Sequence, residues 1–156
     1  MKNTLLFLFL LVILASCEHC GPQKELSLRI YLRGDTLKLD SISALNALNQ
    51  TAFREQIELQ SPNSRQFDLP MSLLADSTTY IFAFKTRTDT LTVFYKRDFS
   101  YKNGCGFIVD AHSPDLPTKA KSTFSKVDVT YDPYVSNELP SFEYIGGNGI
   151  SILVTL

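Results

Sequence analysis

Hydrophobic and polar residues alternate along much of this chain. In residues 26–32 every second residue is Leu or Ile, and the residues between them are Ser, Arg and Tyr. A period of two is typical of a β-strand with one buried face, because successive side chains point to opposite faces. Further apolar segments that fit strands lie at residues 37–39, 57–59, 67–71, 79–85, 91–95, 107–109, 127–131 and 150–156. The pattern predicts an all-β protein.

The connections between these segments favour antiparallel pairing. The clearest hairpin joins residues 79–85 to 91–95 through Thr86–Asp89. Pro70 indicates a strand end or an edge, because proline has no N–H group to donate to a ladder. About eight or nine short strands need two packed sheets to cover their apolar faces, so we expect an antiparallel β-sandwich.

Residues 42–57 allow a second interpretation. Here the apolar residues Ile42, Leu45, Leu48 and Ala52 fall at helical spacing. This segment is therefore the place of the one short helix, at most, that we expect in the protein.

Glycines 146, 147 and 149 form the most glycine-rich stretch of the chain. A phosphate-binding loop would precede a helix, but the residues that follow, 150–156, are β-forming. The stretch therefore predicts a hairpin turn. Residues 113–121 contain Pro114 and Pro117 and show no periodicity, which predicts a surface loop.

The amino terminus has a different character. Eleven apolar residues, Leu5–Ala15, follow Lys2 and lead into Leu14-Ala15-Ser16-Cys17. The run covers about half of the ~20 residues that a membrane-spanning helix needs, and it lacks the polar face of an amphipathic helix. The tetrapeptide resembles the lipobox of bacterial lipoproteins, in which the signal peptide is removed before the cysteine and the cysteine is acylated.

This resemblance divides the chain into three parts. Residues 1–16 are a cleaved signal peptide, residues 17–23 are a tether lipidated at Cys17, and residues 24–156 are a single β-sandwich domain. Removal of the signal peptide leaves 140 of the 156 residues, a size at which one domain buries about 68–70% of its unfolded surface. Two or three acyl chains make the membrane attachment effectively permanent.

Three cysteines are present, and lipidation converts the Cys17 sulfur to a thioether. In the oxidising space outside the cytoplasm, the remaining pair predicts a disulfide between Cys20 and Cys105; the alternative is two unpaired thiols. The Cys17-x-x-Cys20 spacing also fits a redox motif or half of a zinc site, but a thioether cannot cycle through a disulfide. A bridged Cys20 would lie within about 10 Å of the lipidated residue along the chain.

Charge and composition exclude several function classes. The 15 basic and 16 acidic residues nearly cancel, so nucleic acid is not an expected partner. Asp110 and His112 fall on one face of an extended strand, but no nucleophile motif such as G-x-S-x-G accompanies them, and a solvent-facing polar pair is the better interpretation. No metal-binding motif is present. We expect no enzyme activity, no cofactor and no metal.

Four Asp-Ser/Thr steps resemble the acceptor motif of Bacteroidota protein O-glycosylation. The acceptors would be Thr36, Ser41, Ser77 and Thr90. The alternative is that Asp and Ser or Thr are adjacent because both suit turns and strand edges.

The chain as a whole resembles a family of small Bacteroidota outer-membrane lipoproteins of unknown function. The likeness rests on the lipobox, the early Cys20, the strand Asp89–Val93 and the step Cys105-Gly106-Phe107. It favours a strand over a helix at residues 40–48 and implies attachment to the outer membrane. The periplasmic face is preferred over the cell surface, because residues 18–20 lack the dense acidic cluster that resembles a surface-export signal.

Three functions follow from these observations. The first is a non-enzymatic accessory module that binds an outer-membrane protein partner through a strand edge or an aromatic patch. The second is a small-ligand or glycan binder, which needs a concave site lined by several of the 11 Phe and 7 Tyr residues. The third is a hydrolase built around His112, which ranks last because no nucleophile stands out.

Overall fold

The alternating segments form strands, and the described part of the chain contains no helix. The computed structural model describes residues 26–34, 39–47, 54–56, 64–102, 106–136, 143–144, 147 and 149–156. The strands are β1 (Ser27–Arg33), β2 (Leu39–Leu45), β3 (Arg54–Gln56), β4 (Ser64–Pro70), β5 (Ser77–Phe84), β6 (Thr88–Phe94), β7 (Lys96–Lys102), β8 (Gly106–His112), β9 (Ala120–Ser122), β10 (Lys126–Asp132), β11 (Val135–Ser136), β12 (Glu143–Tyr144) and β13 (Gly149–Thr155).

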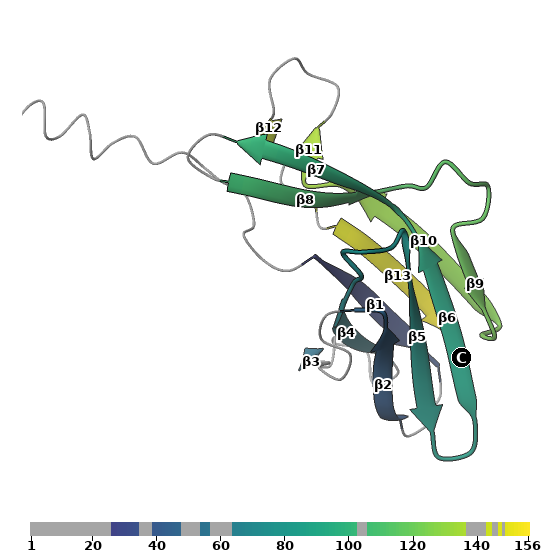
Figure 1. Ribbon diagram of the computed structural model, residues 1–156. Helices are drawn as coiled ribbons and strands as arrows, with labels where there is room; N and C mark the ends of the chain where they lie inside the picture. The colour runs from purple at the N-terminus through teal and green to yellow at the C-terminus, as the bar shows by residue number, and fades with distance from the viewer. Residues whose placement is uncertain are drawn as a thin grey trace, which may run out of the picture.

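Two larger sheets make up the body (Figure 1), as expected for a sandwich-like β fold. One sheet has the order β10-β13-β1-β4-β3 and the other the order β2-β5-β6-β9. The inward side chains of both sheets form one buried cluster, which includes Ile30 of β1, Phe67 of β4 and Phe82 of β5. Phe82 meets Phe124 edge to face at 5.2 Å between ring centroids, an arrangement that aromatic quadrupoles favour.

The predicted hairpin is confirmed, since β5 and β6 pair antiparallel. The predicted alternation of buried and less buried residues in β5 is also confirmed: Tyr80, Phe82 and Phe84 are buried, while the residues between them are half-buried. Pro70 ends β4, as predicted. The helix considered for residues 42–57 is not found in its described residues, where β2 and β3 are strands; residues 48–53 and 57 lie outside the description.

The pairing of β1 with β13 is parallel, from Leu28↔Ile150 to Arg33↔Thr155, whereas the other pairs of described strands are antiparallel. Strand β13 thus lies inside the sheet, between β1 and β10. Its residues Ile150, Ile152 and Val154 are completely buried. The alternation of apolar residues predicted the strand but could not reveal the direction of its neighbour.

The glycine stretch does not form the hairpin turn that we expected. Strands β10 and β11 run outward and β12 and β13 return, so that Asp132 pairs with Gly149 and Val135 with Tyr144. The return passes through Gly147, where a Cβ atom would collide with the carbonyl oxygen of Pro133. Gly147 therefore lies on the returning arm of a long hairpin, between β12 and β13.

Strands β7 and β8 form a two-stranded ribbon that leaves the body (Figure 1). Strand β6 continues into β7 after a single residue, Tyr95, and β8 returns in contact with β10 and β13. Residues 113–119 then connect β8 to the short strand β9, which replaces the last part of the loop predicted for residues 113–121. We call the end of the sandwich from which the ribbon leaves the ribbon end.

No helix in the described residues is long and apolar enough to cross a membrane. The apolar run Leu5–Ala15 lies outside the described residues.

Candidate functional site

The ribbon end brings together segments that are far apart in the sequence. The carbonyl of Leu26, just before β1, accepts a hydrogen bond from the N–H of Met71, just after β4. The loop that follows Met71 ends at Asp76, whose carbonyl accepts a hydrogen bond from the N–H of Tyr95 at the start of the ribbon. The start of the described domain, the loop of residues 72–76 and the base of the ribbon are therefore neighbours.

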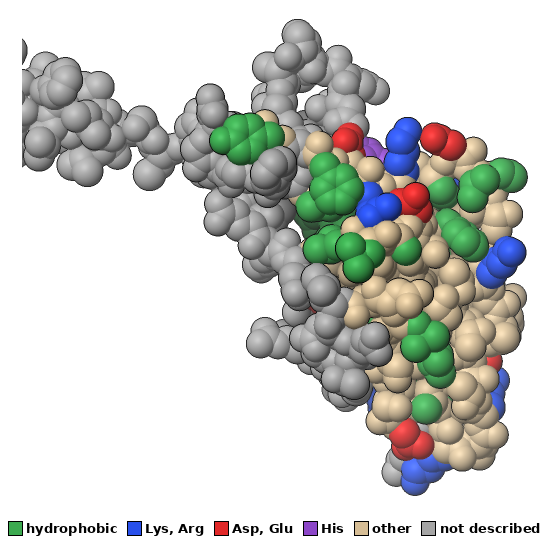
Figure 2. All heavy atoms as spheres, viewed as in Figure 1, with side chains coloured by type: hydrophobic (Ala, Val, Ile, Leu, Met, Phe, Trp, Pro, Cys, Tyr) green, Lys and Arg blue, Asp and Glu red, His purple; other side chains and the backbone are tan. Residues whose placement is uncertain are grey.

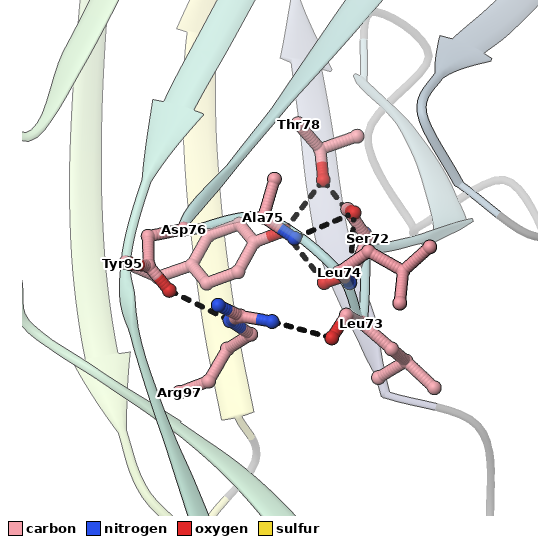
Figure 3. A network of polar contacts seen from close by, with 8 residues as sticks. All are labelled: Ser72, Leu73, Leu74, Ala75, Asp76, Thr78, Tyr95 and Arg97. Carbon is pink, nitrogen blue, oxygen red and sulfur yellow. Dashed lines mark hydrogen bonds and ion pairs between the residues drawn. The ribbon is translucent and has the colours of Figure 1, made fainter.

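Three hydroxyl-bearing residues hold this loop in a closed ring of hydrogen bonds (Figure 3). The Ser72 N–H donates to Thr78 Oγ1 at 2.8 Å, Thr78 Oγ1 lies 2.7 Å from the Tyr95 hydroxyl, and that hydroxyl donates to the Ser72 carbonyl at 2.9 Å. A hydroxyl has one hydrogen, so Thr78 is the donor to Tyr95. Because burial disfavours the phenolate, it raises the pKa of Tyr95.

The Ser72 hydroxyl shapes the turn itself. Its oxygen accepts hydrogen bonds from the N–H groups of Leu74 at 3.2 Å and Ala75 at 3.1 Å. A serine side chain that bonds to the backbone two or three residues ahead makes a compact turn. This turn fixes the backbone of Leu74, the side chain of which is 85% exposed.

Arg97 of β7 joins the loop to the ribbon (Figure 3). Its guanidinium donates to the Leu73 carbonyl and pairs with Asp76 at 2.6 Å. The same guanidinium lies 5.7 Å from the centre of the Phe99 ring, within the range of a cation–π contact. The loop therefore lies on the face of the ribbon that carries Phe99.

Exposed apolar side chains gather at this end. Leu74, Phe99 (56% exposed) and Tyr101 (62% exposed) form what we call the apolar patch. The space-filling view shows hydrophobic side chains grouped near the ribbon (Figure 2). The two other large hydrophobic side chains exposed among the described residues also belong to this end: Leu45 closes β2 opposite Thr79, and Leu116 follows Asp115, which pairs with Lys96 at 3.3 Å. Such a gathering marks an interaction surface more often than a scatter of single residues does.

The sequence-predicted pair Asp110 and His112 lies on β8, beside Asp98 of β7. His112 Nε2 is 3.6 Å from Asp110 Oδ2 and 3.9 Å from Asp98 Oδ2. The expectation of a solvent-facing pair was wrong for Asp110, which is 2% exposed because β8 packs over the sandwich. The His112 ring therefore lies close to one carboxylate from each strand of the ribbon. Among the described residues no group of His, Cys, Asp and Glu is arranged to hold a metal ion.

A hollow of about 450 Å³ lies on the outer face of the five-stranded sheet. Its described lining includes Tyr31, Arg33, Asp128 and Leu153, together with the hydroxyls of Ser64, Thr130 and Ser151. The glycan hypothesis predicted several aromatic side chains at such a site, whereas the described lining offers Tyr31 alone. The described lining therefore lacks the several aromatic side chains that this hypothesis predicted.

The candidate glycosylation residues differ in accessibility. Ser41 and its neighbour Asp40 are both exposed on β2, while Ser77 is half-buried at the start of β5. Thr90 is half-buried on β6, and the preceding Asp89 is 7% exposed and accepts a hydrogen bond from the Thr123 hydroxyl. Thr36 lies outside the described residues. Ser41 is the site at which an enzyme could reach both residues of the motif.

All three cysteines, Cys17, Cys20 and Cys105, lie outside the described residues, so the lipidation and the disulfide remain predictions. Strand β7 ends at Lys102 and β8 begins at Gly106, so Cys105 belongs to the connection between the two ribbon strands.

Comparison with protein-family models, with curated proteins and with solved structures found no match for this chain. Function is therefore inferred from the residues and their geometry.

The apolar patch was missed at the level of sequence, and so was strand β7. In residues 96–102 the two aromatic residues, Phe99 and Tyr101, are separated by one residue, and this was the available signal. Charged residues occur on both faces of this strand, so the sequence did not predict that either face is buried. Leu74 gave no signal, because a single leucine in a loop fits many environments.

Proposed function

We propose that this protein is a lipid-anchored cell-envelope protein that works as a non-enzymatic accessory module at the outer membrane, on its periplasmic face. The observation that carries this proposal is that Leu26, the first described residue of the domain, and the apolar patch lie at the same end of the sandwich. Leu26 bonds to Met71, and the loop that follows presents Leu74. The end nearest to the anchor is thus also the end with exposed apolar surface.

The length of the tether supports the same placement. Leu26 is nine residues beyond Cys17, so an extended tether reaches about 30 Å at most. A domain held that close to a bilayer samples a thin layer of the periplasm. This geometry suits a partner that is itself in the membrane.

The strand edges offer the partner a place to bind. Strands β2 and β10 each pair with one neighbour among the described strands and run along the sides of the body. An edge strand presents N–H and C=O groups to which another chain can add a strand. We propose that an outer-membrane protein binds along one of these edges.

Photo-crosslinking in intact cells tests this proposal. A photoreactive amino acid at Ser41 on β2 or at Lys126 on β10 should give a crosslink to one specific outer-membrane protein. Lys85, in the turn between β5 and β6, serves as the matched exposed control and should give none. The absence of a specific product from both edges would contradict the partner, and an unacylated Cys17 by mass spectrometry would contradict the anchor.

A second candidate function is the binding of a small polar ligand or glycan in the hollow on the outer face. The observation that favours it is the combination of one aromatic ring, Tyr31, with Arg33, Asp128 and several hydroxyls. The volume of the hollow falls within the range of about 300–1,000 Å³ that small-molecule sites occupy. Glycan-array binding that is lost on Tyr31→Ala would support this function, and an array without binding would remove it.

A further inference from the structure

We propose that the apolar patch of Leu74, Phe99 and Tyr101 sits on the lipid bilayer that holds the acyl chains of Cys17. This inference rests on the proposed lipid anchor and adds the orientation of the domain. The ribbon end faces the membrane, and the turn between β5 and β6 faces away from it.

The first support is the position of the tether. It joins the domain at Leu26, the carbonyl of which bonds to Met71, three residues before Leu74. A tether of at most about 30 Å therefore ends beside the patch rather than at the far end of the sandwich.

The second support is the position of Cys105 between the two ribbon strands. With the proposed bridge from Cys20 to Cys105, the ribbon connection is three residues from the lipidated Cys17, which limits their separation to about 10 Å. Tyr101 is the penultimate residue of β7, and Phe99 precedes it by one strand period. The exposed aromatic rings thus lie on the element that the bridge would hold nearest to the lipid.

The third support is the chemistry of the surface. Leu, Phe and Tyr side chains partition into the interface between headgroups and acyl chains, where tyrosine can keep its hydroxyl in water. Among the described side chains next to the patch, Arg97 pairs with Asp76 and Lys96 pairs with Asp115. Contact should therefore depend on apolar burial and change little with salt.

The patch is also held in place before it meets a membrane. The hydrogen-bond ring through Ser72 fixes the loop of Leu74, and Arg97 fixes that loop against the ribbon face of Phe99. A preformed surface loses little conformational entropy when it binds.

Tryptophan fluorescence tests the inference on the full mature lipoprotein, because the natural chain contains no tryptophan. The variants Leu74→Trp, Phe99→Trp and Tyr101→Trp each carry one reporter, and Lys85→Trp is the control at the opposite end. Each protein is reconstituted into vesicles of phosphatidylethanolamine with a minor fraction of phosphatidylglycerol, with or without brominated acyl chains. All four positions are exposed, so the variants should keep the fold, and denaturant midpoints verify this.

We expect brominated lipid to reduce the emission of the Phe99→Trp and Tyr101→Trp variants roughly twofold, since interfacial side chains reach about 5–10 Å into the boundary of the acyl region. Emission from Lys85→Trp should not change. Equal emission with and without bromine at positions 99 and 101, in protein with an acylated Cys17, would overturn the inference while leaving the anchor intact. A blue shift that appears in native membranes but not in vesicles would also overturn it, in favour of a protein on the patch. Loss of the Cys17 acyl mass would overturn the anchor and the orientation together.

Discussion

Ser72 illustrates how one residue can be fixed by side chains from distant parts of the chain. Its N–H donates to the Thr78 hydroxyl, and its C=O accepts a hydrogen bond from the Tyr95 hydroxyl. The Thr78 hydroxyl donates to that of Tyr95 and closes the ring. Each member is buried, so none can replace a lost partner with water at no cost.

We expect Tyr95→Phe to lower the free energy of unfolding by about 1–3 kcal/mol, because it leaves the Ser72 carbonyl and the Thr78 hydroxyl unsatisfied in a buried site. Urea denaturation followed by circular dichroism measures the change. The matched control is Tyr101→Phe, a mostly exposed side chain, which should stay within about 0.5 kcal/mol of the natural protein. Equal losses in the two variants would contradict a special role for the ring.

Buried tyrosines also predict how stability depends on alkaline pH. Burial raises the pKa of Tyr80, Tyr95 and Tyr131 above 10.0, for Tyr131 to about 12. The folded state therefore holds these protons more tightly than the unfolded state, so their contribution to stability is complete below about pH 10 and is lost at higher pH, for Tyr131 as the pH rises through about 12. Denaturant midpoints should stay level up to about pH 9 and then fall. Tyr131→Phe should make that fall shallower, and an unchanged slope would rule out Tyr131 as a contributor.

The identity of the buried residues could be predicted from sequence, but their polar contacts could not. Alternation placed Tyr80, Phe82 and Phe84 on one face, as the structure shows. The ring through Ser72 joins residues separated by up to 23 positions, and no local pattern encodes which hydroxyls meet. For the same reason the burial of Asp110 was missed, since it depends on how β8 crosses the body.

At the scale of elements, the ribbon is attached to the body through a few side-chain contacts. Arg97 contributes two of them, to the Leu73 carbonyl and to Asp76. The pair with Asp76 is partly exposed and is worth little by itself. The bond to a backbone carbonyl in the fixed loop gives the contact its geometry.

We expect Arg97→Ala to destabilise the protein by about 1–2 kcal/mol and to raise amide hydrogen exchange in β7 and β8 more than in β5. Hydrogen exchange followed by mass spectrometry measures both regions. Lys96→Ala is the control, because Lys96 pairs with the highly exposed Asp115 and its loss should leave exchange unchanged. If the two variants give the same exchange pattern, Arg97 does not link the ribbon to the loop.

Most strands could be predicted, whereas their partners often could not. The clear hairpin β5–β6 follows from two alternating segments joined by a short turn, which is local information. The parallel neighbour of β1 comes from the other end of the described chain, and β7 carries polar or charged residues on both faces. The glycine stretch was assigned to a turn because glycine suits turns, but the structure needs Gly147 for a close approach to Pro133.

At the scale of the whole molecule, the proposed anchor and the proposed disulfide make separate predictions. Cys17→Ser should release the protein from the membrane fraction, because it removes the side chain that we propose to be acylated. Fractionation of cells followed by immunoblotting measures the distribution. Cys20→Ser should stay with the membrane, and retention of Cys17→Ser would contradict the anchor.

Cys20→Ser and Cys105→Ser should each lower stability by about 2–4 kcal/mol if the bridge closes a long loop in the unfolded chain. Thermal unfolding with and without reductant measures this, and reductant should have no further effect on either variant. The double variant should match the single ones. A natural protein that is insensitive to reductant would argue for two unpaired thiols.

The place of β13 between β1 and β10 affects the order in which the protein can be assembled. A ribosome makes β1 and β10 before it reaches residue 149, so a growing chain has two strands with no strand to join them. Until residues 149–155 have been translated, β1 and β10 lack the strand that lies between them. The five-stranded sheet can therefore close only after the last of these strands has been made.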